Sequence, residues 1–572
     1  MTSSVRIAII GSGPSGLSCA AHAAKLGVTH LLLEAESHVS HTIYRYQKGK
    51  HVMAEPAILP LRSDISFGAG RREAILGTWQ QEVEAQGVNI RYDSAVTAIT
   101  GAKGAFEIVT ARGERHLAET VVLCIGLQGN IRQLGVPGDD HARVQYQLDD
   151  PDEYSGETIV VVGAGDAGIE NALALADNNR VILLNRTEEL FRVKQGNADL
   201  VNAAVASARM ECRHSTSVTQ VEAIPTDGRP LRLSVSTPLG IEHIACDRII
   251  ARLGAIAPRK LVESFGVTFP SASFDAVPQV SDTYESNVAG FYIIGALGGY
   301  PLIKQAMNQG YEVVEHILGN PVEPADESLL RETFRNFKRA TSVSDALALV
   351  QQQVPLFKGL STLQLREFML DSEVTAPAEA QLVFRKNDYT NSFFSIVEGE
   401  VLIEVDGEAG QMAHVTLGSG QFFGELGLLS GRRRSRTVRA GRGCVLIETP
   451  RRSMLKLLAS NESVRRCIDG VSLRRAIGTR IAPFVSEAGL DELVASASVK
   501  SFTAGQVLFA QGDEADGRRE RRVRQVTPDD DDGDGGARRT RRPGLGLAMA
   551  SHRDASGDGG ASPEAATASM AT

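Results

Sequence analysis

The chain has 572 residues, of which 42% are hydrophobic and 23% are charged, and its formal net charge is −9. A chain of this length exceeds a single hydrophobic core, so we expect about three to four domains of a soluble globular protein. The negative charge gives no electrostatic reason to expect a nucleic-acid partner, and no apolar run is long enough to cross a bilayer.

The cysteines are scattered, with no CxxC pair and no spacing typical of metal ligands. This usage indicates unpaired thiols in a reducing compartment, and it predicts no metal site. A glycine-rich run interrupts the apolar start of the chain, which favours a buried strand over a signal peptide, so we expect a cytoplasmic protein. The cysteines are Cys19, Cys124, Cys212, Cys246, Cys444 and Cys467.

A strand, a glycine-rich loop, a helix and a second strand follow one another at the start of the chain. They are predicted at Val5 to Ile10, Gly11-x-Gly13-x-x-Gly16, Leu17 to Leu26, and Thr29 to Leu33, with Glu34 at the end. Such glycines let backbone N–H groups approach a pyrophosphate at the helix N-terminus, and Glu34 would accept a hydrogen bond from an adenosine ribose hydroxyl. The alternative is a tight turn without a ligand, but the complete pattern favours a dinucleotide site.

The same arrangement recurs in the middle of the first half of the chain. It comprises a strand at Thr158 to Val162, the glycines Gly163, Gly165 and Gly168, a helix to Asp177, a strand at Val181 to Leu184, and then Asn185-Arg186. Arg186, a cation in place of an acid, suits a 2′-phosphate, so NADPH is favoured over NADH. The alternative for Arg186 is ordinary solvated surface. Two such loops imply two nucleotides, a flavin and a nicotinamide.

Further segments have the order found in a known family. These segments are Thr120–Gly126, Leu134–Asp139, Cys246–Gly254 with Pro258, Gly290–Gly295, and Lys304–Ala306 with Gly310. With the two glycine loops, they make residues 1–320 resemble the thioredoxin-reductase-like flavoproteins of the pyridine nucleotide-disulfide oxidoreductase class. The resemblance implies an FAD-binding domain of residues 1–130 and 248–320, an inserted NAD(P)H-binding domain of residues 131–247, and a homodimer. The FAD contacts that it implies come from Gly126, Gly295, Lys304 and Gln305.

The resemblance fails at the redox-active cysteines. Thioredoxin reductase passes electrons from flavin to a CxxC pair just before its second glycine motif, where this chain has Val144-Gln145-Tyr146-Gln147. Bacillithiol-disulfide-reductase-like relatives place a cysteine inside the first glycine motif, where this chain has Ser15. Cys19 lies one helical turn later, but a cysteine in an alanine-rich helix is more often part of the core. We therefore expect no dithiol relay within the chain.

A second departure concerns the flavin. The family usually has Gly-Asp where this chain has Gly295-Ala296, and Ala296 has no acceptor for the ribityl chain. An unpaired ribityl hydroxyl would weaken flavin binding by on the order of 1–3 kcal/mol without excluding FAD. Lys304 and Gln305 would still place a helix N-terminus near the isoalloxazine ring.

The electron acceptor is not specified by the sequence. No acid–base pair or nucleophile stands out, and the polar-aromatic residues Tyr44, Tyr46, Lys48 and His51 either cover the flavin or form an ordinary loop. If electrons leave the flavin, they pass directly to an external acceptor, for which a ferredoxin, a quinone, a low-molecular-weight disulfide and oxygen are all open.

Residues 321–353 have apolar side chains at roughly helical spacing and predict a helical linker. In residues 354–470, Glu425 and Arg434 are spaced to grip the ribose and the phosphate of a cyclic nucleotide, with the backbone at Gly424 and the Ser435 hydroxyl completing the cradle. This region resembles cyclic-nucleotide-binding domains of the catabolite-activator and kinase-regulatory type. Ser435 in place of Thr leans toward cAMP over cGMP.

The end of the chain changes character. Residues 471–516 match the opening of a second cyclic-nucleotide-binding domain, and residues 517–572 have the Arg, Asp, Gly, Ala and Ser composition of a disordered tail. Our hypothesis is a truncated or frame-shifted second domain. No helix-turn-helix module follows, so a DNA-binding regulator is not expected.

Taken together, these patterns predict an α/β protein with two Rossmann-like three-layer domains, followed by a cyclic-nucleotide-binding β-roll with helices. The function that we expect is an FAD-dependent NAD(P)H oxidoreductase, with no catalytic residue assigned, regulated by cAMP or cGMP. One alternative is a non-catalytic sensor of flavin or nicotinamide and cyclic nucleotide that signals to a protein partner. Another is that the cyclic-nucleotide fold survives as an empty interaction module.

Overall fold

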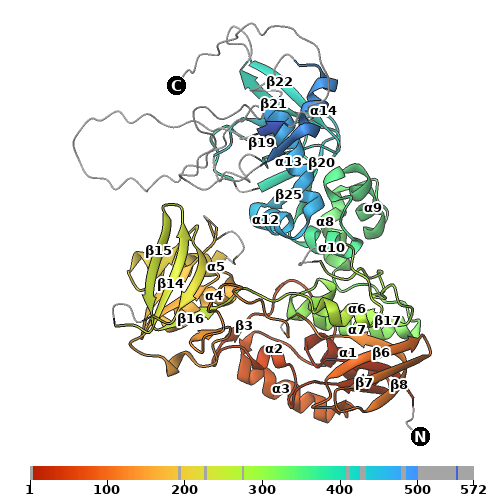
Figure 1. Ribbon diagram of the computed structural model, residues 1–572. Coiled ribbons are helices and arrows are strands. Elements are labelled where there is room, and N and C mark those ends of the chain that lie inside the picture. The colour runs from red at the N-terminus through yellow and green to blue at the C-terminus, as the bar shows by residue number, and fades with distance from the viewer. Residues whose placement is uncertain are drawn as a thin grey trace, which may run out of the picture. The chain divides into compact units, whose positions relative to one another are not determined.

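The computed structural model describes residues 4–127, 129–187, 189–190, 193, 195–224, 228–272, 276–390, 392–406, 412–425, 433–477, 485–499 and 549–551. The chain forms two compact units, coloured by residue number in Figure 1. The first unit comprises Met1–Gln353, Leu360–Ala376 and Val445–Ser460. The second comprises Val354–Gly359, Pro377–Cys444 and Asn461–Thr572.

A largely parallel sheet organises the N-terminal part of the first unit. Its strands, in the order β5-β2-β1-β8-β7-β6 with β17 also paired to β8, are Ile90–Arg91, His30–Leu33, Val5–Ile10, Arg115–Leu123, Ala105–Thr110, Val96–Ala102 and Phe291–Ile293. Both β2 and β8 run parallel to β1, and β17 runs parallel to β8. The carboxyl ends of these four strands therefore lie at one edge of the sheet, where ligands bind in open α/β sheets.

Both faces of this sheet are buried. Along β1, Ile7 and Ile9 belong to one hydrophobic cluster, while Ala8 and Ile10 belong to another. This alternation explains why the strand reads as a continuous apolar run. The surrounding helices and short strands are α1 (Pro14–Lys25), α2 (His41–Tyr44), β3 (His51–Val52), β4 (Gly70–Arg71), α3 (Arg72–Ala85), α6 (Arg259–Ser264), η2 (Gly295–Gly298) and α7 (Ile303–Leu318).

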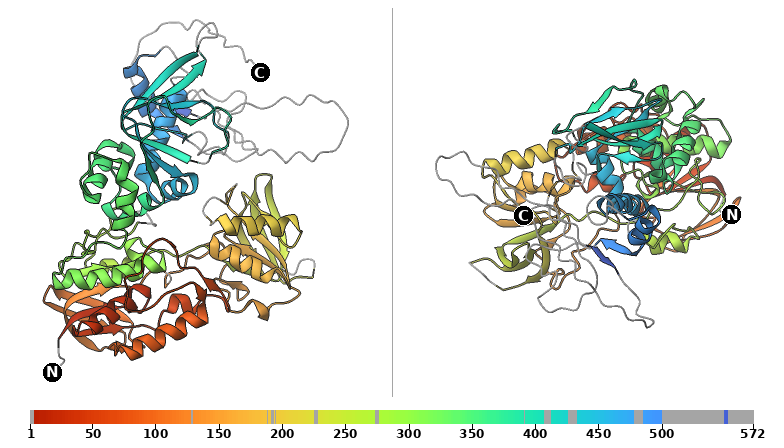
Figure 2. Two further views of the ribbon diagram at one scale, coloured as in Figure 1. Left: turned by 180° about the vertical axis from the view of Figure 1, so that it is seen from behind. Right: turned by 90° about the horizontal axis from the view of Figure 1, so that it is seen from above.

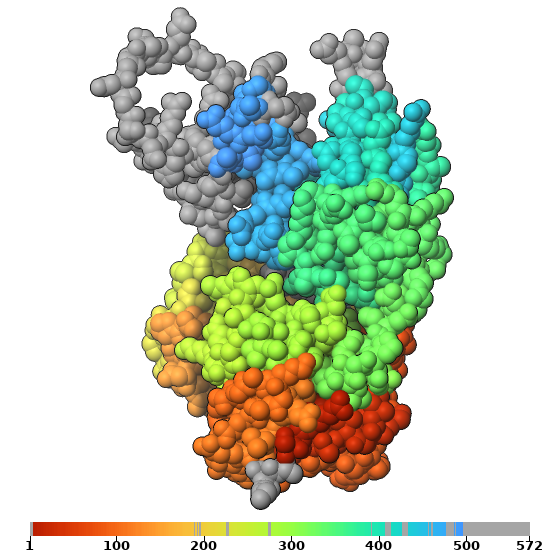
Figure 3. Space-filling model, turned by 90° about the vertical axis from the view of Figure 1, so that its right-hand side faces the viewer, coloured from red at the N-terminus to blue at the C-terminus, as the bar shows by residue number. Residues whose placement is uncertain are grey.

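Helix α7 packs unusually close to α1. A Cβ at Gly310 would overlap the Ser15 carbonyl oxygen and would lie 2.8 Å from the Cys19 nitrogen. The Ser18 hydroxyl also donates to the Met307 carbonyl at 2.7 Å. This contact joins segments almost 300 residues apart, and Figure 3 shows the red-orange and yellow-green segments as one continuous surface. It holds the N-terminus of α7 beside the first glycine loop.

A second parallel sheet carries the second glycine loop. Its strands, in the order β12-β11-β10-β16-β9, are Glu211–Arg213, Arg180–Leu184, Thr158–Val162, Arg248–Ala251 and Val144–Gln145. Helices α4 (Asp166–Leu175) and α5 (Gln195–Ala206) cover one face. The antiparallel strands β13 (Ser217–Glu222), β14 (Leu231–Thr237) and β15 (Gly240–Cys246) cover the other, as Figure 2 shows from behind. Strand β16 begins at Arg248 and lies within this sheet. The domain that carries the second glycine loop therefore extends a few residues past residue 247, where its end was expected.

The remainder of the first unit is mainly helical. It contains η1 (Pro151–Glu153), α8 (Glu327–Thr333), η3 (Phe334–Asn336), α9 (Val343–Gln353), α10 (Thr362–Leu370), β18 (Glu373–Thr375), β25 (Val445–Pro450) and α12 (Arg451–Ser460). Buried Arg366 of α10 binds Asp326 and also Glu327, at 2.8 Å, and so ties this helix to the start of α8. Helices α8 and α9 lie in the segment expected to be a helical linker.

The second unit is built on antiparallel β-strands. Its elements are η4 (Pro355–Phe357), β19 (Leu382–Phe384), β20 (Ser392–Glu398), β21 (Glu400–Asp406), β22 (Met412–Gly418), β23 (Phe422–Phe423), β24 (Val438–Ala440), α13 (Glu462–Ala476), α14 (Glu487–Ser496), β26 (Ala497–Val499) and β27 (Met549–Ser551). One sheet has the order β19-β24-β21-β22, and β20 pairs with β23. The rings of Phe394 on β20 and Phe423 on β23 stack on each other, with their centroids 4.9 Å apart.

The predicted α/β class with a C-terminal β-roll and helices is confirmed. Within the predicted partial second domain, residues 478–484 and 500–516 lie outside the described residues, as does nearly all of the predicted disordered tail.

Candidate functional site

The first glycine loop is shaped by contacts that exclude side chains. Gly11 has a φ of +100°, and a Cβ at Gly16 would overlap the Gly11 carbonyl oxygen. The N-cap of α1 is Gly13, so no side chain caps the helix. Backbone N–H groups at a helix start attract anions, so this loop presents a phosphate-binding surface.

Glu34 lies at the end of β2 beside this loop. The residue is 6% exposed. Its carboxylate accepts hydrogen bonds from the Ser12 backbone nitrogen at 2.7 Å and from the Ser12 hydroxyl at 2.5 Å. It also accepts from the Glu36 nitrogen at 3.0 Å. These bonds fix the carboxylate against the glycine loop. Both Ser12 groups donate to Oε2 and the Glu36 nitrogen donates to Oε1, so Oε1 retains capacity for a ribose hydroxyl.

The residues expected around the flavin gather at the same edge of the sheet. Gly126 and Gly295 both have positive φ, of +59° and +75°, and each follows the carboxyl end of its strand, β8 or β17. Gln309 accepts from the Gly295 nitrogen at 2.7 Å. Lys304, in the first turn of α7, donates to the Pro56 carbonyl at 2.8 Å.

One buried polar atom at this edge fits a flavin. Gln305 is 6% exposed, and its Oε1 atom has no hydrogen-bond partner among the described residues. It belongs to the first turn of the 16-residue helix α7, whose N-cap Leu302 supplies no side-chain hydrogen bond. An unsatisfied acceptor beside a bare helix start matches the donors and acceptors of a flavin ring, so the residues present fit FAD. Ala296, in η2, has no acceptor for the ribityl chain, as expected.

The second glycine loop repeats the geometry of the first. Gly163 has a φ of +105°, a Cβ at Gly168 would overlap the Gly163 carbonyl oxygen, and Gly165 is the N-cap of α4. A cavity of about 480 Å³ lies against this loop, and Arg186 lines it. The start of α4, where backbone N–H groups would bind a pyrophosphate, lies at this cavity.

Strand β11, which follows this loop and α4, is followed by Asn185 and Arg186, whereas β2 is followed by the acid Glu34. Asn185 is buried, and its amide binds locally, accepting from the Thr187 hydroxyl at 3.0 Å and donating to the Glu189 carbonyl at 3.2 Å. Arg186 is exposed at the rim of the cavity. The buried amide thus orders the turn, and Arg186 is the charge that the end of this strand offers to a ligand in the cavity.

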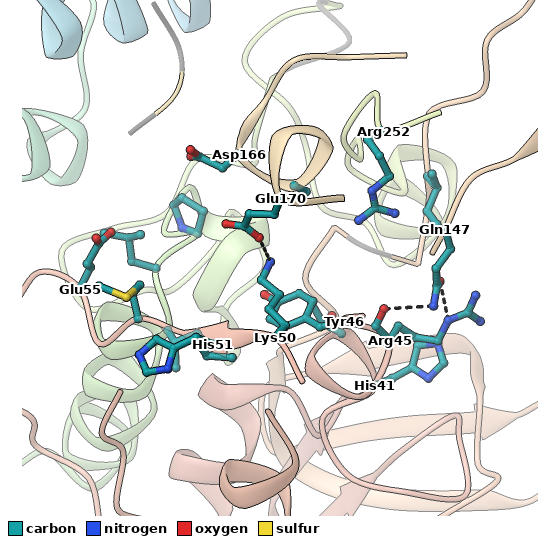
Figure 4. A pocket seen from close by; sticks show the side chains of 18 of the residues that line it. His41, Arg45, Tyr46, Lys50, His51, Glu55, Gln147, Asp166, Glu170 and Arg252 are labelled. Carbon is teal, nitrogen blue, oxygen red and sulfur yellow. Dashed lines mark hydrogen bonds and ion pairs between the residues drawn. The ribbon is translucent and has the colours of Figure 1, made fainter. Parts of the chain in front are cut away.

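A further cavity of about 500 Å³ lies beside the first turn of α7 and the start of α4, and Figure 4 shows its lining. Most of the residues that line it are polar: Lys50 pairs with Glu170 at 2.7 Å, and Arg45 donates to Gln147 at 2.5 Å. His51 also lines it. Ile303 of α7 lines the same cavity, so it adjoins the edge at which the flavin contacts are expected.

The polar-aromatic segment expected near the flavin is divided in its roles. Tyr46 and His51 line this cavity, and burial raises the pKa of Tyr46. Lys48 instead pairs with Asp150 at 2.7 Å, and Tyr44 stacks on His38 with ring centroids 3.8 Å apart. The cavity residues Gln147, Glu170 and Arg252 were not expected from the sequence. The sequence did contain one signal for Arg252: it is a polar residue directly after the apolar run of β16, and ligands bind at the carboxyl ends of such strands.

None of the six cysteines has the features of a redox-active thiol. All six are free, and burial raises the pKa of each one, to about 11 for Cys212 and Cys444 and to about 12 for Cys246. Cys19 and Cys124 are fully buried beside the first glycine loop, and the pKa of each is raised well above the usual range. Because the thiolate is the reactive form, these environments disfavour thiol chemistry.

The expected cyclic-nucleotide residues gather in the second unit. Glu425 and Arg434 are 5% and 4% exposed, and a Cβ at Gly424 would lie 2.7 Å from the Arg434 Nη1 atom. Arg434 donates to the Thr390 hydroxyl at 2.6 Å and to the Ser392 carbonyl at 2.5 Å. Its guanidinium also stacks on Phe384, 4.2 Å from the ring centroid. The residue is thus rigidly held beside Gly424.

Helix α13 contributes a residue that the sequence did not indicate. Arg475 donates to Glu425 Oε1 and to the Phe422 carbonyl, both at 2.7 Å. The carboxylate expected to bind the ribose is therefore already paired with a cation. Ser435 is exposed, and residues 426–432 lie outside the described residues.

Two further features are absent from the described residues. No group of three or more His, Cys, Asp or Glu side chains there could hold a metal ion. No helix in that part of the chain is long and apolar enough to span a membrane.

Comparison with known proteins identifies the family. Residues 8–295, half of the chain, match the family model described as pyridine nucleotide-disulphide oxidoreductase. The chain belongs to this family. Residues 378–461 match the cyclic nucleotide-binding domain model, so the fusion expected from the sequence is confirmed.

Individual relatives cover the oxidoreductase part. The chain is 27% identical over 307 residues to a ferredoxin–NADP reductase of Ignicoccus hospitalis, covering 53% of this chain and 93% of the relative. It is 26% identical over 336 residues to a ferredoxin–NADP reductase of Gluconacetobacter diazotrophicus, covering 56% and 93%. Among solved structures, the bacillithiol disulfide reductase of Staphylococcus aureus matches with a TM-score of 0.51 and 21% identity, covering 56% of this chain and 99% of that one. This last match supports the fold.

Proposed function

We propose that the chain is an NADPH-dependent FAD oxidoreductase that delivers electrons to an external acceptor. The observation that carries this proposal is the pair of glycine loops, each with a positive-φ first glycine and a third glycine that admits no Cβ. Glu34 beside one loop suits an adenosine ribose, and Arg186 beside the other suits a 2′-phosphate. The unsatisfied Gln305 supports a flavin at the first loop.

The residues of this chain would bind and orient rather than react. Glu34 and the first glycine loop would hold the adenosine diphosphate part of FAD, and the start of α7 would lie near the ring. When bound, FAD accepts a hydride from NADPH and passes two electrons onward. The cavity of about 500 Å³ next to α7 has room for reacting rings, and its polar walls would orient them.

The acceptor is external on this proposal, because the chain has no CxxC and burial raises the pKa of each of its thiols. The relatives named ferredoxin–NADP reductase make a ferredoxin the first acceptor to test. Purified protein loaded with FAD would be given NADPH and, in turn, a ferredoxin, a quinone, a low-molecular-weight disulfide and oxygen. Turnover with one of these supports the proposal, and absence of NADPH oxidation with all of them contradicts it.

A cyclic nucleotide would regulate this activity. The family match of residues 378–461 and the burial of the Glu425 and Arg434 side chains support binding. Regulation requires that the nucleotide bind two states of the chain with different affinity. Equal NADPH oxidation rates with and without saturating cAMP and cGMP would remove the regulatory part of the proposal.

A non-catalytic sensor is the second candidate, and Ala296 is the observation that favours it. Without an acceptor for the ribityl chain, flavin binding is weakened. A chain that takes up no FAD but binds cyclic nucleotide would support the sensor.

A further inference from the structure

Arg252 connects the second glycine loop with the cavity beside α7. It directly follows β16, whose last residue, Ala251, is aligned with Val162 at the end of β10. A Cβ at Gly163 would lie 2.5 Å from the Arg252 carbonyl oxygen, and one at Gly168 would lie 3.4 Å from the Arg252 Cβ. The backbone of Arg252 therefore forms part of the wall against which the glycine loop folds.

Arg252 lines both cavities. It belongs to the cavity of about 480 Å³ at the glycine loop and to the cavity of about 500 Å³ beside α7. Figure 4 shows it directed into the second of these, which Glu170 and Gln147 also line. Arg186, in contrast, lines only the first of these two cavities.

The guanidinium is incompletely satisfied. Its Nη1 atom donates to the Tyr146 carbonyl at 2.8 Å, which fixes the side chain. Its Nε atom is buried and has no hydrogen-bond partner within the described part of the chain. Burial lowers the pKa of Arg252, and the nearby Glu170 carboxylate opposes this effect. A buried cationic donor without an acceptor is costly, so a ligand with oxygen acceptors would stabilise it.

A dinucleotide bound at the glycine loop would bring such acceptors. Its pyrophosphate would lie at the start of α4, and its 2′-phosphate would lie near Arg186. The other half carries the nicotinamide, which has to reach the flavin. That half must pass from the first cavity into the second, and Arg252 lines both.

We propose that Arg252 binds the nicotinamide half of NADPH through its phosphate, ribose or carboxamide oxygens and so directs the ring toward the flavin. This inference rests on the proposed function, and it separates two roles: Arg186 recognises the adenosine half, and Arg252 positions the reacting half. A merely structural arginine would hold the Tyr146 carbonyl and make no contact with the nucleotide.

The test compares two ligands that differ only by the nicotinamide half. Binding of NADP⁺ and of 2′,5′-ADP, which carries the adenosine with its 2′- and 5′-phosphates and lacks the nicotinamide half, would be measured by calorimetry on the full chain and on two variants. For Arg252→Gln, we expect NADP⁺ affinity to fall by on the order of tenfold, as for loss of one charge-assisted hydrogen bond, with 2′,5′-ADP affinity unchanged. For Arg186→Gln, the matched control, both affinities should fall together.

The outcomes distinguish the two levels of the argument. Equal losses of both ligands in Arg252→Gln, or no loss of either, would overturn the role of Arg252. If the unaltered chain binds neither NADP⁺ nor 2′,5′-ADP, that result would instead contradict the proposed function. Should Arg252→Gln not fold, Arg252→Lys replaces it: lysine keeps the charge and can reach the Tyr146 carbonyl but lacks the Nε donor, so NADP⁺ should still lose affinity selectively.

Discussion

The two glycine loops and the C-terminal site would each bind a phosphate group, but they would do so with different parts of the chain. In the loops, the backbone at Gly11 to Gly16 and at Gly163 to Gly168 would bind the phosphates, and side chains are excluded. In the C-terminal site, the phosphate would be bound by the side chain of Arg434, which is held by its own hydrogen bonds. A site made of backbone is damaged by added atoms, whereas a site made of a side chain is damaged by removed ones.

The largest effect is expected from an added methyl group in the first loop. In Gly16→Ala, the new Cβ would overlap the Gly11 carbonyl oxygen. We expect a stability loss of about 1–3 kcal/mol and protein that purifies without flavin. Thermal unfolding and the visible spectrum check both. In the control Gly13→Ala, the Cβ would lie 3.7 Å from the nearest atom, so the unfolding temperature should be close to that of the unaltered chain. Normal flavin content in Gly16→Ala would contradict the backbone account.

The converse effect is expected in the C-terminal site. Arg434→Leu removes the phosphate ligand, and cAMP affinity should fall by on the order of a hundredfold, since losing one partner of a buried charge pair costs about 2–5 kcal/mol. Calorimetry with cAMP and with cGMP measures this. The neighbouring Arg433 is exposed and bonds the Asn387 carbonyl at 3.1 Å, so Arg433→Leu should bind nearly as well as the unaltered chain. Unchanged affinity in Arg434→Leu would remove this residue from the site.

Glu34→Gln tests the side chain that lies beside the first glycine loop, where the phosphates would be bound by the backbone. The amide keeps one acceptor but places an NH₂ group where one carboxylate oxygen now accepts either from Ser12 or from Glu36. FAD affinity should fall by about 1.5–3 kcal/mol, the range for a hydrogen bond to a charged group. Titration of the flavin-free protein with FAD gives the value, and an affinity equal to that of the unaltered chain would exclude Glu34 as a ribose ligand.

A smaller effect is expected at the end of β11. Arg186→Gln should lower the preference for NADPH over NADH about tenfold, because one charged contact with the 2′-phosphate is lost while the rest of the dinucleotide site stays. The ratio of the two kcat/KM values reports it. Arg180, at the opposite end of the same strand, is exposed, and Arg180→Gln should leave the ratio unaltered. A preference that persists in Arg186→Gln would assign the 2′-phosphate to another residue.

The smallest effect concerns Arg475. Because it holds Glu425 Oε1, a ribose hydroxyl has to share or displace it. Arg475 is partly exposed, so its ion pair is worth about 1 kcal/mol or less, and Arg475→Ala should bind cAMP a few-fold more tightly. A weaker affinity measured by the same calorimetry would instead make Arg475 part of the binding site.

Local patterns in the sequence predicted much of this account, and contacts between distant segments limited the rest. Strand β1 and the two glycine loops follow from residues within a few positions of one another, although α1 begins at Pro14 rather than at Leu17. Strand β16 joins the second sheet through pairing with β10, which no local pattern near residue 248 reveals. Arg252 and Arg475 are ordinary arginines in the sequence, and only the fold brings them to Tyr146 and to Glu425.

The most direct test of the central claim is an anaerobic titration of the purified, FAD-supplemented chain with NADPH, followed by the visible flavin spectrum. The account predicts a protein-bound flavin whose absorption is lost as NADPH is added in equimolar amount, with NADH less effective. A flavin that binds but is not reduced, or a chain that takes up no FAD, would contradict it.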